Sequence, residues 1–288
     1  MRFRVLGPLE VRTSEGWKGI GAAKRRGVLA ELLVHAGQLV PCDVLAARLW
    51  GDGVPGSHRS LIRKHVMELR RLLEDEAGQT LVRRAPGYLL RAAPDDIDAC
   101  RFENLVDAAR TAFARSGPRH AAPLLTEALE LWRDAPYVDA AASPSAAAEV
   151  GRLEELRLDA VELRIEADLA AGRAGGLAAE LRGLLAHFEL RESLWHLLMR
   201  VQRHTGRTAE ALATYARASR LFADELGAGP GEALRRLHQS ILADDPCDVS
   251  PVPSPHGCAG CAAAGSGPAA AAAGPETAGR VLLLRNTP

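Results

Sequence analysis

Hydrophobic and polar residues follow two different periods along the first 91 residues. A two-residue alternation is typical of half-buried strands, and a spacing of three to four residues is typical of amphipathic helices. We expect strands at residues 3–6, 9–13 and 17–20 with two more inside 80–91, and helices at residues 22–35, 44–50 and 57–74. This part of the chain therefore begins with a small sheet, continues through three helices and ends in a β-hairpin.

From residue 98 onward the pattern is helical. The expected helices cover residues 99–115, 119–132, 144–171, 174–188, 192–204, 208–226 and 232–243. Gly172 and Gly206 lie 34 residues apart, each in the short turn of a helical hairpin, which is the period of tetratricopeptide-type repeats. We predict an all-α domain over residues 98–245. Residues 246–288 are rich in Pro, Gly, Ser and Ala without periodicity, and we expect them to be disordered.

Charge divides the chain at the same place. Residues 1–91 hold 16 Lys and Arg against 9 Asp and Glu, whereas residues 92–288 hold 20 against 27. A basic head on an acidic body indicates a nucleic-acid partner for the head. The N-terminus lacks the apolar run of a signal peptide, no stretch is long enough to span a membrane, and the five cysteines are scattered. We expect a cytoplasmic protein with reduced thiols and no membrane partner.

The helix expected at residues 57–74 has one basic side. Its apolar residues gather on one face; the opposite face carries Ser60, Arg63, Lys64, Met67 and Arg71, with Arg59 and Arg70 at the seam. A basic helix face fits the DNA major groove, where guanidinium groups can pair with guanine edges and lysines with phosphates. The alternative for an isolated basic stretch is an ordinary solvated surface helix.

The hairpin that follows favours the first interpretation. Three helices followed by a β-hairpin form a winged helix-turn-helix, in which the hairpin is a wing beside the groove-reading helix. Here Arg83 and Arg84 stand at the tip of the wing. We expect Gly87 to supply a turn conformation that other residues resist, and Tyr88 to pack in the core.

A second basic cluster opens the helix expected at residues 22–35. Lys24, Arg25 and Arg26 occupy its first turn, which runs against the helix dipole. A phosphate partner would explain the cluster, and chance surface charge is the alternative. Asp43 is the expected N-cap of the helix at residues 44–50, and Ser57 is the expected N-cap of the helix at residues 57–74.

The sequence gives little support for catalysis or metal binding. His256, Cys258 and Cys261, with Cys247 upstream, could supply Cys₃His ligands to zinc, but a single C-x-x-C in a stretch of Ala and Gly is a weak signal. No G-x-x-x-x-G-K-[ST] phosphate loop, Gly-x-Ser-x-Gly elbow or H-E-x-x-H pair occurs. We expect no enzyme activity, no cofactor and no bound metal.

Several segments together resemble the Streptomyces antibiotic regulatory protein family. They are FRVLGPLEV, AAKRRGVLAELL, the basic helix, LVRRAPGYLL, DACRFENLVDAAR and LLTEALELWR, and the likeness continues to about residue 243. The family usually has proline before the first-helix lysine, where this chain has Ala23. Arg63, Lys64 and Glu68 also depart from the family pattern, so the resemblance extends to the fold rather than to the operator sequence.

The resemblance implies a fold that is mostly α with a small N-terminal β component. An OmpR-type winged helix over residues 1–93 would precede a tetratricopeptide-like bacterial transcriptional activation domain. The implied function is transcriptional activation of secondary-metabolite genes: several protomers bind direct repeats in double-stranded promoter DNA and recruit RNA polymerase holoenzyme. The alternative is a helical-repeat interaction protein whose basic head binds RNA or an acidic protein.

Overall fold

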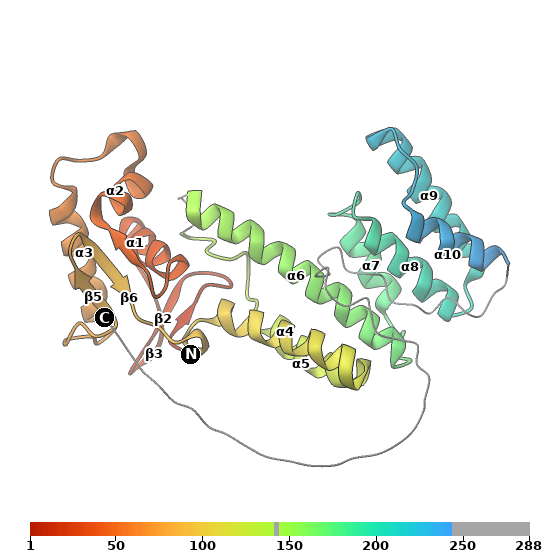
Figure 1. The fold of residues 1–288 in the computed structure, drawn as a ribbon, viewed down its shortest axis with the longest axis horizontal. Coiled ribbons are helices and arrows are strands. Elements are labelled where there is room, and N and C mark those ends of the chain that lie inside the picture. The colour runs from red at the N-terminus through yellow and green to blue at the C-terminus, as the bar shows by residue number, and fades with distance from the viewer. Residues whose placement is uncertain (141–143, 244–288) are drawn as a thin grey trace, which may run out of the picture. The chain divides into compact units, whose positions relative to one another are not determined.

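The computed structural model describes residues 1–140 and 144–243. The predicted tail, including the candidate zinc ligands Cys247, His256, Cys258 and Cys261, lies outside these residues. The described part is mostly helical with two small antiparallel sheets near the N-terminus, as the sequence predicted (Figure 1). None of its helices is both long enough and apolar enough to cross a membrane.

The head contains both sheets and three helices. The first sheet is β1 (Phe3–Arg4), β2 (Glu10–Thr13) and β3 (Gly16–Gly19) in that order; the second has the order β4 (Leu39–Pro41), β6 (Gly87–Leu90), β5 (Leu81–Arg84). The helices are α1 (Ala23–Val34), α2 (Cys42–Trp50) and α3 (His58–Leu72), with short 3₁₀ turns at Gly51–Gly53 and Pro94–Asp96. All the strands and helices expected here are present, with ends shifted by a few residues. Strand β4 was missed, because three residues are too few to show a period.

Gly87 has a different role from the one predicted. Its backbone is not among those with positive φ, so the turn does not require glycine there. A Cβ at residue 87 would instead lie 1.9 Å from the carbonyl oxygen of Val40 and 2.6 Å from the Cα of Pro41. Glycine is needed because β6 approaches β4 too closely for any side chain. Tyr88 is 4% exposed, as expected of a packing residue.

Neither predicted helix cap is formed as expected. Ser57 does precede α3, but its side chain makes no capping hydrogen bond. Asp43 lies inside the first turn of α2, whose N-cap position is Pro41. The carboxylate of Asp43 binds side chains of α3 instead.

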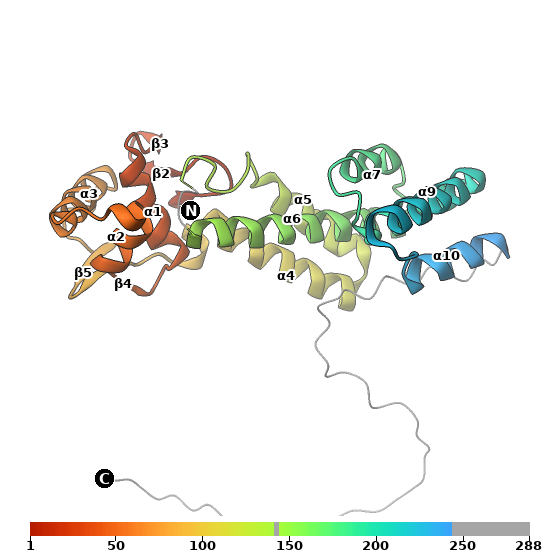
Figure 2. The same cartoon turned by 90° about the horizontal axis from the view of Figure 1, so that it is seen from above.

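The described part of the body, residues 98–140 and 144–243, contains seven helices, close to those predicted. They are α4 (Asp98–Ser116), α5 (Pro118–Glu130), α6 (Pro144–Ala170), α7 (Leu177–Leu185), α8 (Glu192–His204), α9 (Thr208–Leu226) and α10 (Glu232–Leu242). Gly172 and Gly206 lie in the turns after α6 and α8 with φ of 78° and 74°, where a side chain would be strained. Figure 2 shows α4 and α5 beside α6. Trp195 is buried at 1% exposure, and Trp132 packs edge-on against Phe102, so both are core residues.

Two buried clusters form the interior. One contains the head together with α4, α5 and the first half of α6, and the other contains the end of α6 and α7–α10. The first cluster is continuous across the boundary that the sequence predicted between residues 93 and 98. The head therefore shares its core with the first helices of the body.

A buried carboxylate joins head and body. Asp98, at the start of α4, is 1% exposed and accepts hydrogen bonds from the backbone N–H of Val5 at 2.7 Å and of Leu6 at 3.2 Å. Burial raises the pKa of this carboxyl group, and the backbone hydrogen bonds and the nearby Arg133 oppose that shift. The segment after α5 adds further links, since Arg133 N donates to Leu6 O and Leu9 N donates to Asp139.

Candidate nucleic-acid interface

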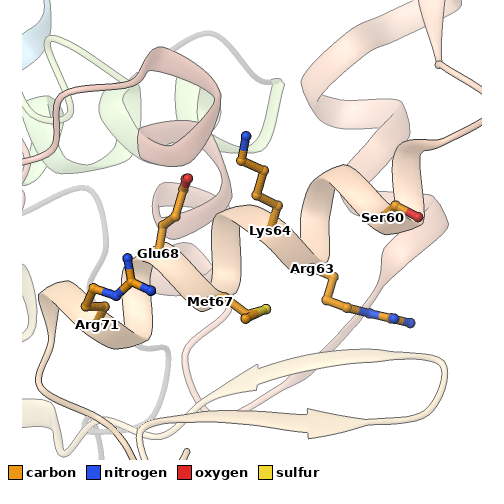
Figure 3. A pocket seen from close by; sticks show the side chains of 6 residues that line it. All are labelled: Ser60, Arg63, Lys64, Met67, Glu68 and Arg71. Atoms are coloured by element: carbon orange, nitrogen blue, oxygen red, sulfur yellow. The ribbon is translucent and has the colours of Figure 1, made fainter.

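The two sides of α3 differ in burial, as its sequence pattern predicts. Ile62, Val66 and Leu69 are buried where α3 packs on α1 and α2. The outer side forms an open hollow of about 300 Å³, lined by Ser60, Arg63, Lys64, Met67, Glu68 and Arg71 (Figure 3). The structure therefore brings together, on one exposed surface, the five residues predicted for the outer face. We call this surface the α3 face.

Three cations of the α3 face have no hydrogen-bond or ion-pair partner in the part of the chain that the structure describes. Arg63, Lys64 and Arg71 are exposed, and no hydrogen bond or ion pair joins them to any other described residue. Free guanidinium and ammonium groups on a helix that is fixed by its buried side are available to an anionic partner. Their positive charges are not used in ion pairs among the described residues.

The wing presents two more cations. Strand β5 ends at Arg84, which pairs with Gly87 across the hairpin, and both Arg83 and Arg84 are exposed. Within the described ranges neither side chain has a hydrogen bond or an ion pair. In Figure 1, β5 and β6 lie next to α3.

Arg70 fastens the wing to α3. Its guanidinium donates to the carbonyl oxygen of Leu81 at 3.0 and 2.5 Å, so it is partly buried rather than directed outward. Asp75 orders the loop between the two elements, because its carboxylate accepts the backbone N–H groups of Gln79, Thr80 and Leu81. The role of Asp75 was not predicted from the sequence, although an aspartate shortly before a run of turn residues is a signal for such a loop.

Two cations of the α1 cluster make contacts within the chain. Lys24 donates to the carbonyl oxygen of Leu49 and lies 5.4 Å from the ring of Trp50. Arg26 donates to Ile20 O at 2.7 Å and pairs with Asp139. These contacts attach α1 to the end of α2 and to the segment after α5. They give a structural reason for the charges, and the predicted DNA contact remains a prediction for both residues.

Arg25 neutralises the one carboxylate of the α3 face. It pairs with Glu68 at 2.8 Å, and His65 Nδ1 lies 3.6 Å from the same carboxylate. Partial desolvation raises the pKa of Glu68, but the ion pair and hydrogen bond with Arg25 outweigh it and the net shift is downward. Glu68 is therefore ionised and compensated, which makes the α3 face more positive than its composition suggests.

Asp43 holds Arg59 and His58 at the start of α3. It accepts a bidentate hydrogen bond from Arg59, at 3.1 and 2.8 Å, and lies 2.9 Å from His58 Nε2. These hydrogen bonds, that of Arg59 foremost, lower the pKa of Asp43 to about 2. The pair ties the first turn of α3 to α2, so Arg59 is exposed but already paired.

The described residues contain no group of three His, Cys, Asp or Glu that could hold a metal ion. Cys42 and Cys100 are free thiols, and burial is the main cause that raises the pKa of each.

Comparison with known proteins agrees with this architecture. The model of the family described as bacterial transcriptional activator domain matches residues 97–242. Regulatory protein DnrI of Streptomyces peucetius is 33% identical over 85% of this chain and 93% of its own length. Transcriptional regulator RedD of Streptomyces coelicolor is 35% identical over 88% of this chain and 73% of its own length.

Larger proteins match as well. Regulatory protein AfsR of S. coelicolor is 36% identical over 85% of this chain, which spans 24% of AfsR. The solved structure of Mycobacterium tuberculosis EmbR in complex with a low affinity phosphopeptide superposes with a TM-score of 0.82 at 31% identity. That match covers 86% of this chain and 66% of EmbR. The chain belongs to the Streptomyces antibiotic regulatory protein family, a family of transcriptional regulators that carry the bacterial transcriptional activator domain.

Proposed function

We propose that this protein is a sequence-specific, double-stranded DNA-binding activator of secondary-metabolite genes. The observation that carries the proposal is the α3 face, where three exposed cations without an ion pair among the described residues lie on a helix that is buried on its other side. A helix of this kind fits the major groove, which is about 12 Å wide. The wing cations Arg83 and Arg84 would contact the neighbouring phosphates.

The two predicted domains receive different tasks in this proposal. Residues 1–93 bind the promoter, and residues 98–245 recruit RNA polymerase holoenzyme and contact a neighbouring protomer on direct repeats. The shared core and the bonds of Asp98 support a fixed orientation between the groove-reading helix and α4. A fixed orientation lets the position of the DNA site determine where the polymerase-binding surface lies. Since the DNA partner is chromosomal, we expect the protein in the cytoplasm.

Selection from a random pool of duplexes tests the proposal. The full chain is used to enrich bound duplexes, and the affinity for the enriched and for a scrambled duplex is then measured by fluorescence anisotropy at several salt concentrations. We expect preference for the enriched duplex and a log–log salt slope of about −0.9 for each phosphate neutralised. Protection of direct repeats in a footprint, and increased transcription by RNA polymerase holoenzyme from a promoter carrying the site, complete the test.

One control variant and two comparisons of ligands test this proposal against the alternative. Leu226→Ala changes an exposed residue at the end of α9, away from the α3 face, and should bind like the wild type. Equal affinity for all duplexes, or tighter binding to single-stranded RNA than to any duplex, would favour the interaction protein with a basic head and overturn the activator.

A further inference from the structure

Met67 is an apolar residue in the middle of a charged surface. Its side chain is 59% exposed, the highest value among the large apolar residues of the head. Single exposed apolar residues are ordinary on protein surfaces. The position of Met67 distinguishes it, because it lies one helical turn from Arg63 and one from Arg71 and lines the same hollow.

The geometry of α3 separates the α3 face into two rows. Figure 3 shows Arg63 and Met67 projecting from one side of the helix and Lys64 and Glu68 projecting from the other. Four residues separate the members of each pair, which places them one above the other on a helix. A duplex that engages Arg63 therefore also meets Met67.

The polar side chains of the α3 face can make the hydrogen-bonded contacts to bases, and Met67 can make only an apolar one. Arg63, Lys64 and Arg71 can pair with guanine edges or with phosphates. Glu68 could accept from the amino group of cytosine, but its carboxylate is bound by Arg25 at 2.8 Å. Met67 has no hydrogen-bond donor and only a weak acceptor, so it can recognise a base edge only through apolar contact.

We propose that Met67 reads thymine, through contact of its thioether side chain with the C5-methyl group in the major groove. This proposal rests on the proposed function, since it requires the α3 face to enter a duplex. The methyl group is the one apolar feature that distinguishes the four base pairs in that groove. The unbranched methionine side chain has three rotatable bonds and can adapt to the methyl position.

Removal of single methyl groups from the DNA tests the proposal. A duplex enriched from the random pool is resynthesised with each thymine replaced in turn by deoxyuridine, which changes only the methyl group. At the thymine that Met67 contacts, we expect deoxyuridine to raise the wild-type Kd about fourfold. This factor corresponds to the free energy of burying one methyl-sized group. The Met67→Ala variant should bind the thymine and deoxyuridine duplexes equally well.

Matched variants identify the contact. Met67→Leu keeps an apolar side chain and should keep most of the discrimination, whereas Met67→Gln should lose it. Leu226→Ala, with a similar exposed fraction of 58%, should discriminate like the wild type. Because Met67 is exposed, all its variants should retain the circular-dichroism spectrum and unfolding midpoint of the wild type.

The outcomes separate the two proposals. If no duplex is enriched over the starting pool, the proposed function fails and this inference fails with it. If a duplex is enriched, but no thymine shows an effect of deoxyuridine that depends on Met67, the inference is wrong and the proposed function stands.

Discussion

Replacing Asp98 with alanine removes the carboxylate that joins head and body. Asp98 Oδ1 accepts the N–H of Val5 at 2.7 Å, and Oδ2 accepts the N–H of Leu6 at 3.2 Å. Both donors belong to buried residues, and the Asp98 side chain is itself 1% exposed. Oδ1 also accepts the N–H of Ala99 at 2.9 Å. Alanine would therefore leave three buried backbone N–H groups without their acceptor.

The size of the effect follows from these three bonds. Each buried polar group left unsatisfied destabilises the fold by about 1–3 kcal/mol, so the loss for three is about 3–9 kcal/mol. Alanine also removes an unfavourable contribution, since burial raises the pKa of Asp98 and thereby penalises its charged form. Because these two effects oppose each other, we expect the free energy of unfolding to fall by about 3 kcal/mol, at the lower end of that range.

Urea unfolding of the full chain, followed by tryptophan fluorescence and circular dichroism, measures this change. Asp139→Ala is the control, because Asp139 accepts the N–H of Leu9 at 2.9 Å and pairs with Arg26 at 3.4 Å, but its side chain is 32% exposed. Water can replace that acceptor, and we expect a loss below about 1 kcal/mol. An Asp98→Ala variant within about 1 kcal/mol of the wild type would refute the role assigned to this carboxylate.

Three further predictions concern the α3 face and the wing. Arg25→Ala should weaken DNA binding several-fold, because the charge of Glu68 would then repel the phosphates. The double variant Arg25→Ala/Glu68→Gln should restore binding in anisotropy titrations. A double variant that binds as weakly as Arg25→Ala would instead indicate that Arg25 contacts the DNA directly. Arg83→Ala and Arg84→Ala should each weaken binding to every duplex alike and reduce the salt slope by about 0.9, and a changed sequence preference in anisotropy titrations would contradict this. Gly87→Ala should lower the free energy of unfolding by about 3 kcal/mol, because the added Cβ clashes with Val40. The control Gly21→Ala, whose added Cβ meets nothing within 4 Å, should leave urea unfolding nearly unchanged. If both variants unfold alike, the close approach of β6 to β4 is not the reason for glycine at residue 87.

The features that the sequence predicted well are those that depend on local periodicity. Helices α8 and α9 were predicted with the observed ends, because Gly206 interrupts a strong 3.6-residue pattern. The inner and outer sides of α3 were predicted for the same reason. The face that a helix buries depends on spacing within the helix itself, so a single sequence contains that information.

The features that the sequence did not reveal are pairings between distant residues. Arg25 and Glu68 are 43 residues apart, and Asp98 and Val5 are 93 apart. Only tertiary packing determines whether such charges meet each other or face solvent. For that reason Lys24, Arg25, Arg26, Arg59 and Arg70 were predicted from their charge alone, and the structure gives each of them a partner within the chain.

The specificity ratio of Arg63→Ala tests the central claim most directly. The ratio compares the affinities for the enriched and the scrambled duplex at one salt concentration, for the wild type, Arg63→Ala and Arg84→Ala. If the exposed side of α3 reads bases, the ratio should fall at least about fivefold in Arg63→Ala, because a lost base contact weakens binding by about 1–3 kcal/mol. The ratio should stay near the wild-type value in Arg84→Ala. An unchanged ratio in Arg63→Ala would contradict the account.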